Sequence, residues 1–240
     1  MSKPQAPTLL AFGAHPDDIE FGCGGVIARE TQAGAKAHFV VCSRGEAATN
    51  GTPAQRTREA KAAAALLGAT VEFIDLGGDA HFEVTAAYTL KLAAAIRRVR
   101  PTVVLAPSVV ENQHPDHAKL GRMVRDAARL ARYGGVKELK RLAPVAIEQL
   151  FFYAVTPEAE PTDLGRVLVA VSNEEAFRRW VAAMEAHASQ MKTRNYLELQ
   201  LTRARLNGLR AGAEYAVPLF PADALLVESL SQLGRGARRF

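Results

Sequence analysis

Three of the six histidines lie in two very short segments, and both segments also contain aspartates. The first His-Asp segment is Ala14–Asp18, with the sequence Ala-His-Pro-Asp-Asp, and the second is His114–His117, with the sequence His-Pro-Asp-His. In each segment two candidate metal ligands stand three residues apart, so that a tight turn can aim both toward one point. Two imidazoles and one carboxylate form a common catalytic zinc site that leaves a fourth position open for water. The two segments therefore predict a metal site with spare aspartate and histidine side chains for acid–base catalysis.

The rest of the chain alternates between short apolar runs and longer helical stretches. The predicted strands are Thr8–Ala14, Ala37–Cys42, Val71–Leu76, Thr102–Ala106, Ile147–Val155 and Arg166–Val171. The stretches between them that are rich in Ala, Leu, Arg and Lys at helical spacing are Gly25–Ala33, Pro53–Leu67, Ala86–Val99 and Asp116–Ala131. Two later helices are predicted, one beginning at Ser172, which has capping-box spacing to Glu175, and one over Tyr196–Leu209. This rhythm indicates a parallel sheet that helices cover on both faces.

The order of the predicted strands brings the two His-Asp segments together. Loops at the carboxyl ends of parallel strands carry the functional residues of α/β proteins, and the two segments follow the first and the fourth predicted strand. In the common strand order 3-2-1-4 these two strands are neighbours. We therefore expect a Rossmann-like α/β fold: a parallel sheet, mixed at its edge, with helices on both faces and a C-terminal extension. One domain spans residues 1–240, with a core over residues 1–155 and the extension over residues 156–240.

Length and composition exclude several classes of protein. The chain has 240 residues, 48% of them apolar, with a net charge of +5 and a pI near 9.4. Its basic residues are spread over the whole length instead of forming a stripe, so we expect no nucleic-acid partner. No apolar run approaches the ~18 residues that a membrane span needs. Cys23 and Cys42 are too few for a disulfide framework, and we interpret them as inert packing residues. We expect a cytoplasmic protein that acts on a small molecule and binds no membrane.

Simpler interpretations apply to several of these residues. Either His-Asp segment alone could be only a turn before a helix, and their joint presence after two strands is what favours a site. The run Gly22–Gly25 weakly imitates a dinucleotide fingerprint, but Ile27 stands where the third glycine belongs, so we interpret the run as a place of close helix packing. We interpret His38 as a satisfied residue of a strand. His187 belongs either to a partly buried helix face or to the rim of the site or an interface.

The two His-Asp segments resemble the signatures of the LmbE-like (PIG-L-type) zinc-dependent N-acetylglucosaminyl deacetylases. Further segments that look like positions of this family are Gly22–Gly25, Arg44–Glu46, Asn50–Thr52 with Arg56, Ala106–Pro107 and Glu185–Gln190. The resemblance covers about residues 8–200 and is nearest to the bacterial branch that includes the bacillithiol-biosynthesis deacetylases.

The chain departs from the family pattern at two places. After the third strand the family often has Pro-Asp, where this chain has Gly77–His81. Asp79 can keep the role of that aspartate, and His81 either reaches the mouth of the site or lies in a surface loop. Near the end, Tyr215-Ala216 is followed by Val217 instead of the glutamate of the nearest relatives, so the choice of substrate can differ here.

The resemblance implies a metal centre with its general base. His15, Asp18 and His117 would hold one Zn²⁺ per chain, and the same two-histidine, one-carboxylate set also suits Fe²⁺. Asp17 would be the general base that takes a proton from the attacking water.

The resemblance also implies four further roles. His114 would stabilise the oxyanion or protonate the leaving amine, and Asp116 would orient and polarise His114. Arg56, in a loop over the site, and Tyr196 would contact the substrate.

The activity implied by the resemblance is hydrolysis of an acetyl group from an N-acetylglucosaminyl conjugate, with N-acetylglucosaminyl-malate as one candidate. The resemblance also implies a homo-oligomer, often a hexamer. Two other functions stay open: a catalytically weak, sugar-binding relative, and a hydrolase of another small N-acyl compound. The intact set of histidines and aspartates favours the enzyme, because a binding module has no need of a base beside a metal.

Overall fold

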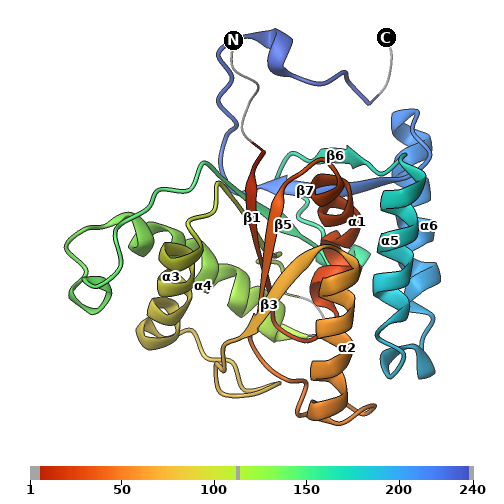
Figure 1. Cartoon of the computed structure of the whole chain (residues 1–240). Coiled ribbons are helices and arrows are strands. Elements are labelled where there is room, and N and C mark those ends of the chain that lie inside the picture. Colours follow the sequence, from red (N-terminus) through yellow and green to blue (C-terminus); the bar gives the residue numbers. More distant parts are fainter. Residues whose placement is uncertain (1–5, 112–113, 238–240) are drawn as a thin grey trace.

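Seven strands form one sheet in the computed structural model, which describes residues 6–111 and 114–237 (Figure 1). The strands are β1 (Thr8–Gly13), β2 (Lys36–Val41), β3 (Ala69–Phe73), β4 (Val103–Pro107), β5 (Gln149–Tyr153), β6 (Val167–Ala170) and β7 (Ala216–Pro221). Their order in the sheet is β3-β2-β1-β4-β5-β7-β6. The first five pair in parallel, whereas β7 runs antiparallel to both β5 and β6. The predicted order 3-2-1-4 and the mixed edge are confirmed.

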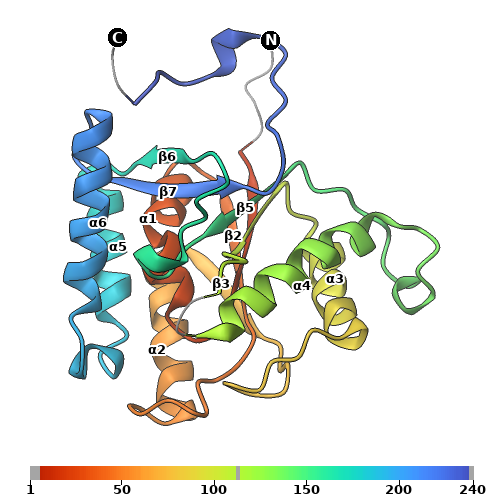
Figure 2. The ribbon, with the colours of Figure 1, turned by 180° about the vertical axis from the view of Figure 1, so that it is seen from behind.

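Helices cover both faces of the sheet, as predicted. They are α1 (Asp18–Gln32), α2 (Pro53–Leu66), α3 (Ala86–Val99), α4 (Pro115–Arg132), α5 (Glu174–Glu185) and α6 (Tyr196–Ala211). Figures 1 and 2 show α3 and α4 on one face, and α1, α2, α5 and α6 on the other. Each side has its own apolar core, because strand residues alternate between the faces: Leu9 and Ala11 of β1 join one core, and Leu10 and Phe12 join the other. The α/β fold class is thereby confirmed.

The C-terminal extension joins the same sheet. It contributes β6 and β7 to the sheet and α5 and α6 to the layer that packs on α1 and β7. The sequence analysis identifies no strand at β7, because Pro218 and Pro221 are atypical of a strand that pairs on both sides.

Two predicted helix starts are wrong. The first helix begins at Asp18 and not at Gly25, so the glycine run lies inside α1. The fifth helix begins at Glu174 and not at Ser172, because the cap is Asn173, whose side chain accepts the backbone N–H groups of Glu175 and Ala176.

Close packing explains the glycines of α1. A Cβ atom on Gly22 would lie 2.2 Å from Cδ2 of Tyr153, and Gly24 and Gly25 face the ring of Trp180 in the same way. The ring of Tyr153 has little freedom to retreat, since its hydroxyl donates a hydrogen bond of 2.6 Å to the carbonyl oxygen of Phe12. The glycines therefore let α1 approach β5 and α5, as the sequence analysis expects of them.

Several residues outside the His-Asp segments have ordinary structural roles. His38 on β2 contacts Thr70 and Glu72 of β3, which fits a satisfied strand residue. Cys23 and Cys42 are buried free thiols whose pKa values burial raises. In the described part of the chain, no helix combines the length and the apolar character that crossing a membrane requires.

We predict that Gly22→Ala lowers the free energy of unfolding by about 1–3 kcal/mol, the typical cost of overpacking a well-filled core. Urea denaturation measures the change. Gly135→Ala is the matched control, since a Cβ atom there meets nothing within 4 Å. Equal stability of the Gly22→Ala variant and the parent chain would contradict the packing role of this glycine.

Candidate active site

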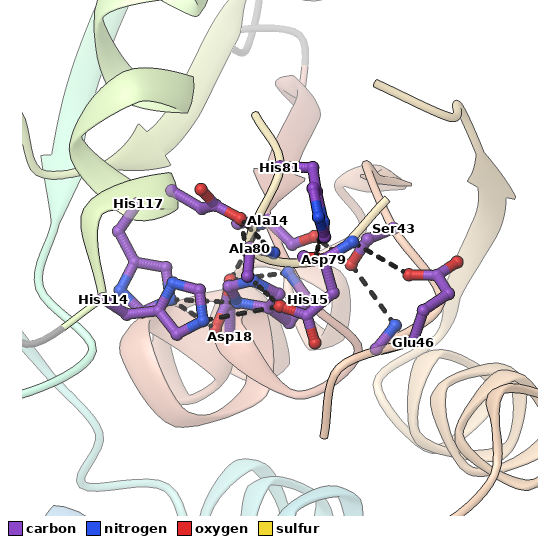
Figure 3. A network of polar contacts seen from close by, with 12 residues as sticks. Ala14, His15, Asp18, Ser43, Glu46, Asp79, Ala80, His81, His114 and His117 are labelled. Carbon is purple, nitrogen blue, oxygen red and sulfur yellow. Dashed lines mark hydrogen bonds and ion pairs between the residues drawn. The ribbon is translucent and has the colours of Figure 1, made fainter. Parts of the chain in front are cut away.

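The two His-Asp segments meet at the carboxyl ends of β1 and β4, which are paired neighbours in the sheet. The first segment leads from β1 into α1, and the second supplies the N-cap and first turn of α4. Both line one cavity of about 550 Å³. The close-up in Figure 3 shows their side chains converging from opposite sides.

Three predicted ligands face one another across this cavity. The Nδ1 atom of His15 lies 3.3 Å from Nε2 of His117, which lies 3.0 Å from Oδ1 of Asp18. The other carboxylate oxygen of Asp18, Oδ2, lies 3.5 Å from Nδ1 of His15. A tetrahedral cation with bonds of about 2.0–2.1 Å separates neighbouring ligand atoms by about 3.3–3.4 Å. The three side chains therefore fit a divalent cation, and this cluster could hold a metal ion.

Asp18 shapes the turn as well as the ligand set. Its Oδ2 atom accepts the backbone N–H groups of Ala14 and His15, each at 2.8 Å, which folds the segment back on itself. Burial alone would raise the pKa of Asp18, but His117 and His15 hold it well below its usual value. Burial alone would lower the pKa of His15. The neighbouring carboxylates, Asp18 above all, instead raise it well above its usual value. Both shifts come from attraction between opposite charges in a buried place, with His117 the stronger partner of Asp18.

Two more carboxylates lie behind His15. Oδ1 of Asp79 is 3.1 Å and Oδ2 of Asp116 is 3.6 Å from its second ring nitrogen, Nε2. Histidines that bind a metal through one nitrogen commonly present the other to a carboxylate, which fixes the tautomer and the ring orientation. Asp116 is itself held by the backbone N–H of Ala80 at 2.8 Å. The loop after β3 therefore helps to aim His15 at the cavity.

The same loop places a carboxylate beside His114. Oδ1 of Asp79 lies 3.4 Å from Nε2 of His114, while the backbone N–H of Asp79 donates to Glu46 at 3.0 Å. Asp79 is thus a further carboxylate beside His114, in the same cluster as Asp116. Glu46 was not predicted as part of the site. The signal for Asp79 was its position after the third predicted strand, where the resembled family often has Pro-Asp. His81 is exposed, and its ring contacts the carbonyl oxygen of Asp79.

Asp17 lines the cavity beside the three ligands, at the N-cap of α1. Its backbone has a φ of 122°, a conformation that costs a non-glycine residue of order 1–3 kcal/mol. Burial raises the pKa of Asp17 to about 6, with Arg56 opposing and Asp18 reinforcing the rise. Arg56 Nη2 lies 3.3 Å from Oδ2 of Asp17 and donates to the carbonyl oxygen of Pro16 at 2.8 Å.

The remaining predicted residues also reach the cavity. Arg56 and Tyr196 both line it, and the ring of Tyr196 lies 5.6 Å from the ring of Phe21. Arg56 lies in helix α2, so the prediction that it lies in a loop is wrong. The arrangement brings together a metal-ligand triad, a carboxylate with a pKa near neutrality and a histidine beside a carboxylate. These groups suit hydrolysis of an amide, which needs an electrophile, a base and an acid.

Comparison with known proteins identifies the family. The sequence profile of PIG-L, described as GlcNAc-PI de-N-acetylase, matches residues 10–128. The chain is 30% identical over 185 residues to the uncharacterized deacetylase YaiS of Escherichia coli K12, an alignment that covers 75% of this chain and 90% of YaiS. The chain belongs to the PIG-L family of deacetylases. The prediction from the sequence that the chain is an enzyme of this family is thereby confirmed.

Two further likenesses add to this assignment. The crystal structure of the conserved protein TT1542 from Thermus thermophilus superposes with a TM-score of 0.82 at 31% identity, covering 96% of this chain and all of that one. The 4-oxalmesaconate hydratase of Pseudomonas putida KT2440 is 33% identical over 149 residues, and the matched region spans 57% of each chain. The chain is thus also similar in sequence to a relative that is named for hydration.

We predict that His117→Ala weakens metal binding by roughly 100-fold or more, since loss of a ligand should exceed the 10- to 100-fold cost of losing a residue that only supports one. Elemental analysis after dialysis against a metal buffer measures the occupancy. His114→Ala in the same segment is the control, and its occupancy should match the parent chain. Equal metal loss in both variants would show that the ligand of the second segment is assigned wrongly.

Proposed function

We propose that this chain removes the acetyl group from an N-acetylglucosaminyl conjugate with one bound divalent cation, in the first place Zn²⁺. The observation that carries the proposal is the meeting, in one cavity, of a two-histidine, one-aspartate ligand set with Asp17. The match to the PIG-L profile, which is named for a de-N-acetylase, supports the same chemistry. Fe²⁺ suits the same ligands and is the alternative cation.

Asp17 acts as the general base in the proposed reaction. A cation held by His15, Asp18 and His117 would polarise the acetyl carbonyl and make the attacking water more acidic. The carboxylate of Asp17 accepts the proton of that water. A pKa of about 6 leaves Asp17 mostly ionised at neutral pH and still basic enough to take a proton. The contact with Arg56 holds its Oδ2 atom in a fixed direction.

His114 acts on the opposite side of the reacting carbonyl. Its ring lines the cavity, and Oδ1 of Asp79 lies 3.4 Å from its Nε2 atom. In its protonated form this ring can hydrogen-bond the oxyanion and then give its proton to the leaving amine. Asp116 keeps the orientation of His15 in this scheme. Its predicted action on His114 stays a prediction.

The cavity is of the right size for a sugar. Its volume of about 550 Å³ falls in the range of about 300–1,000 Å³ that is typical of small-molecule sites. Its lining mixes the aromatic rings of Phe21 and Tyr196 with the polar side chains of Asn50, Thr156 and Gln190. We propose that this side of the cavity, with Arg56, binds the sugar ring.

Hydration of a carboxylate compound is the second candidate. The matched hydratase is 33% identical to this chain, compared with 30% for the deacetylase YaiS. A substrate with several carboxylates calls for cationic side chains. Among the described residues that line the cavity, Arg56 alone is a lysine or arginine, and its Nη2 atom is already engaged by Asp17 and Pro16. This charge balance favours the neutral acetamide over the carboxylate compound.

Release of free amine tests the proposal. The metal-loaded protein is incubated with N-acetylglucosamine, N-acetylglucosaminyl-malate and a panel of other small N-acyl compounds, with and without a chelator. Chelator-sensitive amine release from an N-acetylglucosaminide supports the deacetylase. Turnover of other N-acyl compounds alone would support the broader hydrolase, and bound metal without any turnover would support the sugar-binding relative.

Self-association is part of the proposal. Leu226 and Leu230, in the segment after β7, expose 96% and 81% of their surface, and a second copy of the chain would remove this apolar area from water. We propose that the chain forms a homo-oligomer, with the hexamer as the first candidate. Sedimentation velocity gives the number of subunits.

We predict that Asp17→Asn keeps the metal but lowers kcat by about 10²- to 10⁴-fold, the usual contribution of a general base. The amide has nearly the shape of the carboxylate but cannot accept the proton. Steady-state amine release and elemental analysis on the same preparation give the two numbers. Undiminished turnover in the metal-replete variant would remove Asp17 from the mechanism.

We predict an acidic limb in the pH dependence of kcat/KM, with an apparent pKa of about 6 or lower. The base must be ionised to act, so activity is present above this pKa and falls about tenfold per pH unit below it. A rate that stays constant down to pH 4 would contradict the role of a titrating carboxylate.

A further inference from the structure

The turn that follows α5, residues 186–190, contacts α1 and α2, two of the helices that carry residues beside the cavity. We call it the α5 turn. The Nε2 atom of its His187 lies 3.5 Å from Oε2 of Glu20 on α1. Ser189 donates to the carboxylate of Glu59 on α2, from its hydroxyl at 2.6 Å and from its backbone N–H at 3.1 Å. The α5 turn thereby links α1 to α2. Helix α5 itself packs against both of these helices (Figure 1).

The two contacts fall one helical turn behind the residues that face the cavity. Glu20 follows Asp17 by three residues, and Glu59 follows Arg56 by three, a spacing that places each pair on one side of its helix. Asp17 and Arg56 contact each other at 3.3 Å. The pair at the cavity is therefore braced from behind by one short turn.

His187 is a costly residue to bury at this place. Its side chain has no exposed surface, and among the described residues neither ring nitrogen makes a hydrogen bond of good geometry. A buried polar ring without such bonds costs free energy that an apolar side chain of similar size would not. Stability alone therefore does not account for a histidine here.

The surroundings of His187 give the ring an electrostatic role. Burial alone would lower the pKa of His187, but Glu20, Asp17 and Glu59 act on it and raise the pKa above its usual value. They favour the cationic ring, which strengthens its contact with Glu20 in the first turn of α1. Asp17 needs support of this kind, because a non-glycine residue with a φ of 122° persists only where its surroundings hold it.

We infer that His187 is a positioning residue for Asp17. Its contact with Glu20 fixes the first turn of α1 against α5, so that Asp17 stays at the cavity beside Arg56. His187 does not itself line the cavity. The inference rests on the proposed function, in which Asp17 is the general base.

A double-mutant cycle of Asp17→Asn and His187→Gln, at equal metal content, tests the inference. His187→Gln alone should lower kcat by about 10- to 100-fold with little change in KM, since a shift of about 1 Å in a catalytic group can cost ~10²-fold. In the Asp17→Asn background the same change should cost less than about threefold, because its effect acts through Asp17. His38→Gln on β2 is the matched control and should leave kcat unchanged.

Two outcomes overturn the inference and leave the proposed function standing. One is an unchanged kcat in folded His187→Gln protein, and the other is a double variant in which the two losses multiply in full. If His187→Gln does not fold, Glu20→Gln removes the same ion pair with almost no change in volume and takes its place in the cycle.

A parent protein without any turnover would instead contradict the proposed function. A crystal structure of His187→Gln then decides the inference by itself, because positioning requires the contact of 3.3 Å between Asp17 and Arg56 to be lost. An unchanged contact in that structure overturns it.

Discussion

Parallel pairing of β1 with β4 is the contact on which the candidate site depends. The pairing sets Leu9 against Val103, Leu10 against Val104 and Ala11 against Leu105, and both strands are buried between the two apolar cores. Burial on both faces fixes this register, because a slip of one residue would turn every side chain to the other core. The two strands therefore end at the same edge of the sheet. The segments that follow them bring His15 and His117 to within 3.3 Å of each other, although the two residues are 102 positions apart in the sequence.

The site concentrates charges where burial is expensive, and each charge is offset by a specific contact. Asp18 accepts two backbone N–H groups and faces His117, while Asp116 accepts the N–H of Ala80 and faces His15. An ionised carboxylate without such partners would shift its pKa upward instead. Asp17 shows that shift, because burial outweighs its contact with Arg56. Of the two adjacent aspartates, Asp18 thus has the low pKa that suits a metal ligand, and Asp17 has the raised pKa that suits a base.

The sequence was enough for the order of the first four strands and for the meeting of the two His-Asp segments, because apolar strands and His-Asp turns are local patterns. Helix α1 was placed too late, since glycines lower helix propensity and the reason for them, the approach to Tyr153 and Trp180, is a long-range contact. Strand β7 was missed because Pro218 and Pro221 have no backbone N–H to donate and are atypical of a strand that pairs on both sides. The place of Asp79 beside His114 and the bracing of Asp17 by the α5 turn depend on loops whose course no local pattern specifies.

Anomalous diffraction at the zinc edge, from crystals of the metal-loaded protein, tests the central claim that the two His-Asp segments form one metal centre. We expect one strong peak per chain, about 2.0–2.2 Å from Nδ1 of His15, a carboxylate oxygen of Asp18 and Nε2 of His117. A second cluster of potential ligands on the far side of the ring comprises Nε2 of His15 with Asp79, His114 and Asp116. A peak there, or no peak between the two segments, would contradict the account.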